Sequence, residues 1–155
     1  MSITRTLTLT LVATTLLRVT ALAQEKPIKR ADLPPAVEKT VAAQSQGATI
    51  KGLTTEREKG QVLYEAELSV SGYSKDILMD GNGAIVEIEE QVAIESLPPA
   101  VKNGLLAKAG QGKLLRVESL TKNGKLVAYE AVVLTRGKRS EVQVGPDGKP
   151  LDHQE

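Results

Sequence analysis

Apolar and polar residues alternate over residues 62–70, with Leu63 as the exception, which is the pattern of a β-strand with one buried and one exposed face. The apolar side carries Val62, Tyr64, Ala66, Leu68 and Val70, and the other side carries Leu63, Glu65, Glu67 and Ser69. The alternation returns further along the chain, where the apolar side carries Val127, Tyr129, Ala131 and Val133. Additional strands are predicted over residues 49–57, 77–79, 85–88 and 142–144.

Two other segments have apolar residues at the i, i+4 spacing of a helix, namely Val37 with Val41 and Val101 with Leu105. Each segment follows a pair of prolines. A residue before proline is kept out of the α region, and proline is favoured as the first helical residue, so we expect helices to begin at Pro35 and Pro99. We expect no side-chain cap from Asp32 or Ser96, because prolines occupy the positions whose N–H groups they would bond.

The pentapeptide LPPAV occurs twice, at residues 33–37 and 97–101, and other matches follow in the same order. They pair Val62, Tyr64, Glu65, Ala66, Gly72, Ile77 and Gly83 with Val127, Tyr129, Glu130, Ala131, Gly137, Val142 and Gly148. Agreement in this order predicts an internal repeat. We assign residues 24–91 to the first unit and residues 92–155 to the second.

Each unit reads as one helix followed by about four antiparallel strands, which predicts an α+β fold. One helix cannot cover both faces of such a sheet. We therefore expect one continuous, curved antiparallel sheet with the helices on one face and the other face exposed. Pro150 falls where Ile85 stands in the first unit, so the last strand of the second unit should be short, frayed or at an edge.

The first 23 residues have the features of a cleaved signal peptide: Arg5, an apolar segment from Leu7 to Leu17, and Ala21-Leu22-Ala23 as the cleavage site. Arg18 interrupts the apolar segment, which argues against a membrane span. A disordered or membrane-anchoring N-terminus is the alternative. We expect a periplasmic or secreted protein with no membrane span after cleavage.

Composition removes several kinds of chemistry. The chain has 155 residues and no Cys, which excludes disulfides, thiol nucleophiles and zinc–thiolate sites. His153 is its only histidine and lies in the C-terminal tail, so the usual catalytic triads and imidazole metal sites are not expected. A net charge of +1 and 2% aromatic residues argue against nucleic-acid binding. We predict no enzyme activity and no cofactor.

Carboxylates remain as candidates for chemistry. Glu87, Glu89 and Glu90 could serve a two-carboxylate hydrolase, but no apolar pocket that would raise one pKa is evident, so a solvated acidic strand is favoured. Asp80-Gly81-Asn82-Gly83 has part of a calcium-loop pattern. The twelfth loop position would be Gln91 instead of Glu, so we favour a tight turn and leave Asp80 as a weak calcium candidate.

The exposed sheet face is the candidate binding surface, and it differs between the units. The first unit presents Glu65 and Glu67, and the second presents Ala128, Glu130, Val132 and Leu134. An exposed apolar patch often marks an interface, although the tail or residues 92–96 could cover it. The first unit has eight Lys and Arg against twelve Asp and Glu, and the second has ten against seven. This asymmetry could steer a partner or only attract one half to the other.

The order of these motifs resembles the PepSY-like family, whose two-repeat members are grouped with beta-lactamase-inhibitor-like proteins. The resemblance rests on residues 33–37, 62–66 and 80–87 and on their copies at 97–101, 127–131 and 145–152. It implies a small envelope or secreted α+β protein that binds or restrains peptidases or other proteins, and it supplies no catalytic residues. We therefore predict a non-enzymatic protein-binding module, inhibitor-like in its mode of action. The alternative is a calcium-responsive or structural envelope protein.

Overall fold

The computed structural model describes residues 25–58 and 60–155, so the expected signal peptide lies outside the described residues. The described residues form eight strands: β1 (Lys26–Pro27), β2 (Thr49–Glu58), β3 (Gln61–Val70), β4 (Tyr73–Met79), β5 (Ile85–Val92), β6 (Lys113–Lys122), β7 (Lys125–Thr135) and β8 (Lys138–Val144). The same residues also form two α-helices, α1 (Pro35–Gln44) and α2 (Pro99–Ala109). Short 3-10 turns at Arg30–Asp32 and Ile94–Ser96 precede the helices.

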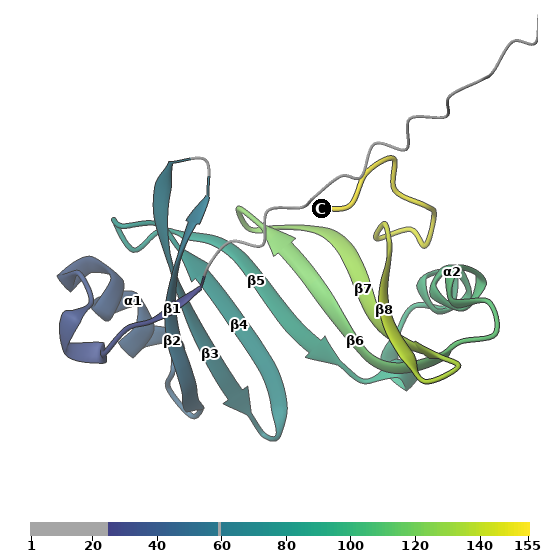
Figure 1. Cartoon of the computed structure of the whole chain (residues 1–155), viewed down its shortest axis with the longest axis horizontal. Coiled ribbons are helices and arrows are strands. Elements are labelled where there is room, and N and C mark those ends of the chain that lie inside the picture. Colours follow the sequence, from purple (N-terminus) through teal and green to yellow (C-terminus); the bar gives the residue numbers. More distant parts are fainter. Residues whose placement is uncertain (1–24, 59) are drawn as a thin grey trace, which may run out of the picture.

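All eight strands belong to one antiparallel sheet, in which each strand pairs with the next along the chain. The sheet is open, since β1 and β8 are its two edges. Figure 1 shows the curved sheet with α1 at the β1 end and α2 at the β8 end. The predicted α+β fold with one antiparallel sheet is confirmed.

The helices begin where the proline pairs predict. Pro35 and Pro99 are the first helical residues, Pro34 and Pro98 are the N-caps, and neither helix has a side-chain cap. The helix α2 ends at Gly110, whose φ of 59° is in the left-handed region that glycine adopts at low cost.

Each helix covers its own part of the core. In the first cluster, Val37 and Val41 of α1 pack with residues of β3 and β4: Ala66, Leu68, Ile77 and Met79. In the second cluster, Val101 and Leu105 of α2 pack with residues of β6 to β8: Val117, Ala131, Val133 and Val144. Ile88 of β5 contacts the first cluster and Val92 of the same strand contacts the second. Residues four apart on a strand lie on the same face. Both helices therefore cover one face of the sheet, as predicted.

The second half departs from the prediction after β8. We expected a fourth strand there that is short, frayed or at an edge, but among the described residues no strand follows Val144. The chain instead turns, with the Gly145 N–H donating to the Lys149 carbonyl at 2.8 Å, and Pro150 has no N–H to donate to a ladder. The tail then reaches the sheet again, where the Glu155 N–H donates to Gln143 Oε1 at 2.9 Å.

The turns after β4 and β8 make equivalent contacts with the two helices. A Cβ on Gly83 would collide with the Ala36 carbonyl, and a Cβ on Gly148 would collide with the Ala100 carbonyl. In the first half, Thr40 Oγ1 donates to the Gly83 carbonyl at 2.7 Å. In the second half the helix has Gly104 beside the Gly148 carbonyl, where a Cβ would not fit. The backbone of each helix therefore lies directly against the backbone of the turn that follows β4 or β8.

Candidate functional site: the open face of the sheet

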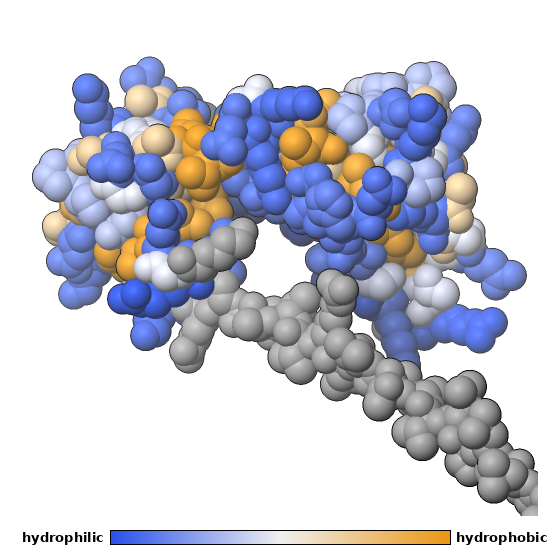
Figure 2. Space-filling view, turned by 90° about the horizontal axis from the view of Figure 1, so that it is seen from above, coloured by the Kyte–Doolittle hydropathy of each residue, from blue (hydrophilic) through white to orange (hydrophobic). Residues whose placement is uncertain are grey.

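The sheet face without helices, called the open face below, is built from alternate residues of β2 to β8. Its side chains form rows across the strands because the antiparallel register places them opposite one another. One row runs Glu65–Leu78–Glu87–Lys122, and the next runs Glu67–Asp76–Glu89–Leu120–Ala128. Figure 2 shows the molecule hollowed between its two ends, with mainly hydrophilic side chains at the back of the hollow.

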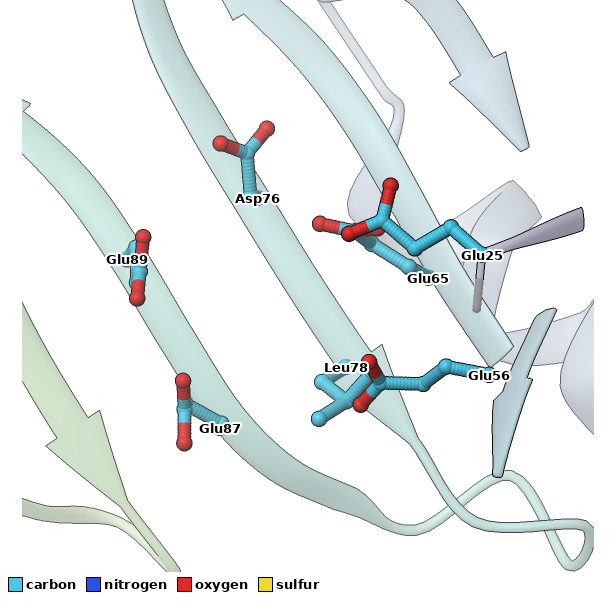
Figure 3. Close-up of a pocket in the computed structure, with 7 residues that line it drawn as sticks. All are labelled: Glu25, Glu56, Glu65, Asp76, Leu78, Glu87 and Glu89. Carbon is cyan, nitrogen blue, oxygen red and sulfur yellow. The ribbon is translucent and has the colours of Figure 1, made fainter. Parts of the chain in front are cut away.

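The β2–β5 part of this face contains a pocket of about 250 Å³, called the acidic pocket below. It is lined by Glu25, Glu56, Glu65, Asp76, Leu78, Glu87 and Glu89. Figure 3 shows Glu25 and Glu65 on one side, Glu87 and Glu89 on the other, and Asp76 between them. The strands β3 and β5 contain no lysine or arginine, and Lys75 of β4 pairs with Glu90 on the helix-covered face at 3.7 Å.

Burial, and then crowding by other carboxylates, raises the pKa values of Glu56, Glu65, Asp76 and Glu89. Burial raises the pKa of Glu89 to about 8, and the carboxylates of Glu87, Glu130, Glu118 and Asp76 add to the effect. Burial and nearby carboxylates, Glu65 first among them, raise the pKa of Asp76 to about 6. The pKa of Glu65 is also raised by burial, although the hydrogen bond from Thr54 at 2.8 Å opposes the shift. Among the acids that line the pocket, Glu87 has Lys122 within 3.5 Å, and no ion pair with a described residue is formed by Glu65, Asp76 or Glu89.

The acids at the boundary with the second half do have partners. Glu118 is buried, with 4% of its surface exposed, and its carboxylate accepts from Ser74 at 3.0 Å and lies 3.3 Å from Arg116. Lys122 lies 3.5 Å from Glu87 and 3.8 Å from Glu155. A buried carboxylate is tolerated when paired in this way. These pairs separate the acidic pocket from the second half of the face.

The apolar patch expected on the second half is interrupted by charges. Val132 lies between Arg116 and Glu141, and Leu134 lies between Lys113 and Arg139. Val132 and Leu134 are half-buried. Ala128 is 0% exposed, so its side chain cannot touch a partner and we remove it from the candidate surface. Glu130 also lies on this face and accepts a hydrogen bond from Gln143 at 2.6 Å.

The hairpin between β7 and β8, called the basic hairpin below, is the positive counterpart of the acidic pocket. Arg136, Lys138 and Arg139 are exposed there, and Arg139 borders the same small hollow as Val132. Among the described residues none of these three cations forms an ion pair. Sequence reasoning missed this hairpin as a feature, although the net positive charge of residues 92–155 was a signal for it.

The structure also bears on the predictions made for Asp80, for the acidic residues of β5 and for His153. The Asp80 carboxylate accepts the N–H groups of Asn82 and Ala84, both at 2.9 Å, so it serves the predicted tight turn. Within residues 25–58 and 60–155, no group of three or more potential ligand side chains could hold a metal ion. The favoured interpretation of a solvated acidic strand is wrong at Glu89, which is half-buried and whose pKa is raised to about 8 by burial. His153 has an exposed side chain, 3.7 Å from Glu155.

No protein-family model matches the chain, and no curated protein matches its sequence. Solved structures do match. A DUF2874 family protein from Bacteroides ovatus has 18% identity and a TM-score of 0.60, over 77% of this chain and 85% of that one. A protein from Bacteroides eggerthii, named provisionally as periplasmic, has 17% identity and a TM-score of 0.63, over 79% of this chain and 88% of that one.

A BLIP-like protein from Bacteroides fragilis also matches, with 21% identity and a TM-score of 0.56 over 77% of this chain and 83% of that one. Together these likenesses establish a BLIP-like α+β fold for the chain. The resemblance to the PepSY-like family stays a prediction. The described part of the chain contains no helix of the length and apolarity that a bilayer crossing requires.

Proposed function

We propose that this protein is a non-enzymatic module of the bacterial periplasm that binds a protein partner on its open face. The observation that carries the proposal is the one-sided sheet. Both helices pack on one face, and the opposite face of strands β2 to β8 presents charged and half-buried apolar side chains. A curved sheet with one face free of helices can receive a complementary surface without rearrangement of the backbone.

The expected signal peptide supports the periplasmic location. The provisional description of the Bacteroides eggerthii protein agrees with it. The absence of Cys is compatible with an envelope protein that is stabilised by its core alone.

Binding with inhibition by occlusion is the finer form of this proposal, and the BLIP-like neighbour supports it. In that form Val132 and Leu134 make apolar contact with the partner, while Glu65, Glu67 and Glu130 set its orientation. Charged side chains at an interface give specificity and orientation more than affinity. The apolar pair is therefore the better target for a variant that removes binding.

The chain is further proposed to consist of two related units, residues 24–91 and 92–155. The equivalent contacts of Gly83 with Ala36 and of Gly148 with Ala100 support this division, because they occur at matching positions of the two sequences. The units would then share one sheet, and the open face would extend across both.

A comparative pull-down tests the binding function. Wild-type protein, the double variant Val132→Lys/Leu134→Lys and the control Leu106→Lys are immobilised and exposed to the envelope and secreted fractions of the source cells. Leu106 is 45% exposed on α2, away from the open face, so its replacement adds charge without touching the proposed site. We expect wild type and the Leu106 variant to retain one common protein and the double variant to lose it. Equal retention by all three would reject this use of the open face.

A further inference from the structure

Two surfaces of opposite charge lie at opposite corners of the open face. The acidic pocket is in β2 to β5, and the basic hairpin joins β7 and β8. On β6, Lys122 pairs with Glu87 beside the acidic pocket, whereas Lys113 is in the row of Leu134 and Arg139. Nine residues of strand separate these rows, which corresponds to about 30 Å. The basic hairpin therefore cannot reach the acidic pocket of its own chain.

We propose that the basic hairpin of one copy of this protein docks into the acidic pocket of a second copy. The charges are complementary: Arg136, Lys138 and Arg139 extend from a narrow hairpin, and six acidic side chains line the pocket that would receive it. The inference goes beyond the proposed function, because it needs no foreign partner and can fail while that function holds.

The spacing of the carboxylates in the acidic pocket favours the binding of a polypeptide over the binding of a metal ion. The carboxylates are spread over four strands and the N-terminal segment, and among the described residues they form no group that could hold a metal. A hairpin with several cations can neutralise such a dispersed set at once. Burial and neighbouring carboxylates raise the pKa values of Asp76 and Glu89, and guanidinium or ammonium groups from another chain would offset that effect.

The symmetry of the contact determines the expected assembly. If each copy inserts its hairpin into the other, the contact closes as a two-fold dimer. If the insertion is one-directional, it generates larger ring or open assemblies. Since the contact is electrostatic and partly exposed, either assembly should dissociate as salt rises.

Light scattering coupled to gel filtration tests the inference on the purified protein. We expect assembly at about 20 mM salt and dissociation at about 0.5 M salt. Lys138→Glu/Arg139→Glu and Glu56→Lys/Asp76→Lys should each be monomeric at low salt. The control Lys102→Glu/Lys108→Glu, which changes the charge of α2 equally to the hairpin variant, should assemble as wild type does. Circular dichroism establishes that each variant is folded.

Mixing the two charge-reversed variants supplies the sharper test. Their hairpins and pockets are complementary to each other although neither variant matches itself, so the mixture should recover the mass of the wild-type assembly. A monomeric wild type at low salt, or assembly that persists in both reversed variants, would overturn the inference. The same result would leave the pull-down test of the proposed function unaffected, because that test changes Val132 and Leu134.

Discussion

At the residue scale, carboxylates on the open face divide into paired and unpaired groups. Glu118 has Arg116 and Ser74 as partners, whereas Glu89 faces further acids and has a pKa of about 8. Glu65, Glu67 and Glu130 were placed on this face by alternation alone, because their strands have a regular period of two. The raised pKa of Glu89 could not be predicted, because it depends on burial and on neighbours from β4, β6 and β7.

Glu89 should make the stability of the protein depend on pH. Its pKa in the folded state is raised from 4.5 to about 8. Glu89 therefore does not destabilise the fold below pH 4.5. Its destabilising effect grows as the pH rises from 4.5 to 8 and is complete above pH 8. Asp76, Glu87, Glu118 and Glu130 face it and add to this effect. Glu89→Gln should therefore raise the free energy of unfolding at pH 9 and leave it nearly unchanged at pH 4.5.

The expected gain at pH 9 is about 1–2 kcal/mol, less than the full pKa shift implies, since the side chain is partly open to water. Urea unfolding at both pH values measures it. Glu95→Gln is the control, because Glu95 is exposed outside the sheet and should show no such dependence. An equal change in stability at both pH values would contradict the electrostatic explanation.

At the element scale, the proline pairs predicted the helix starts and the alternation predicted β3 and β7. The strand β6 was not assigned from the sequence, because a bulge at Leu115, between Leu114 and Arg116, breaks its alternation. Pro150 predicted that the last strand of the second unit would be short, frayed or at an edge, and among the described residues no strand follows Val144.

At Gly104, where α2 contacts the last turn, helix propensity and steric fit predict opposite effects of an alanine substitution on stability. Replacing Gly104 by alanine in a helix normally stabilises it by about 1 kcal/mol. Here the added methyl group would collide with the Gly148 carbonyl, so Gly104→Ala should instead destabilise the protein by about 1–3 kcal/mol.

Thermal and urea unfolding measure the effect of Gly104→Ala. Gly81→Ala is the matched control, since no atom lies within 4 Å of its added Cβ, and it should change stability little. A stabilised Gly104 variant would show that helix propensity outweighs the contact, and that α2 can move away from the turn at low cost.

At the scale of the whole molecule, the two helices organise separate core clusters, but the sheet is continuous between them. The join is made by β5 and β6, which pair from Glu87–Lys122 to Val92–Val117. Ile88 contacts one cluster and Val92 the other, so a single strand is part of both cores. Unfolding one half would expose the shared strand and remove an edge partner from the other half.

The two halves should therefore unfold in one cooperative transition. Tyrosine fluorescence can follow each half, because Tyr64 packs against the first cluster and Tyr129 against the second. Tyr129→Phe and the double variant Tyr64→Phe/Tyr73→Phe leave tyrosines in one half only. Coincident urea midpoints, after allowance for the stability of each variant by circular dichroism, would show that β5 couples the halves. Separate midpoints would mean that each core is stable alone. One half of the sheet could then unfold while the part of the open face on the other half stays folded.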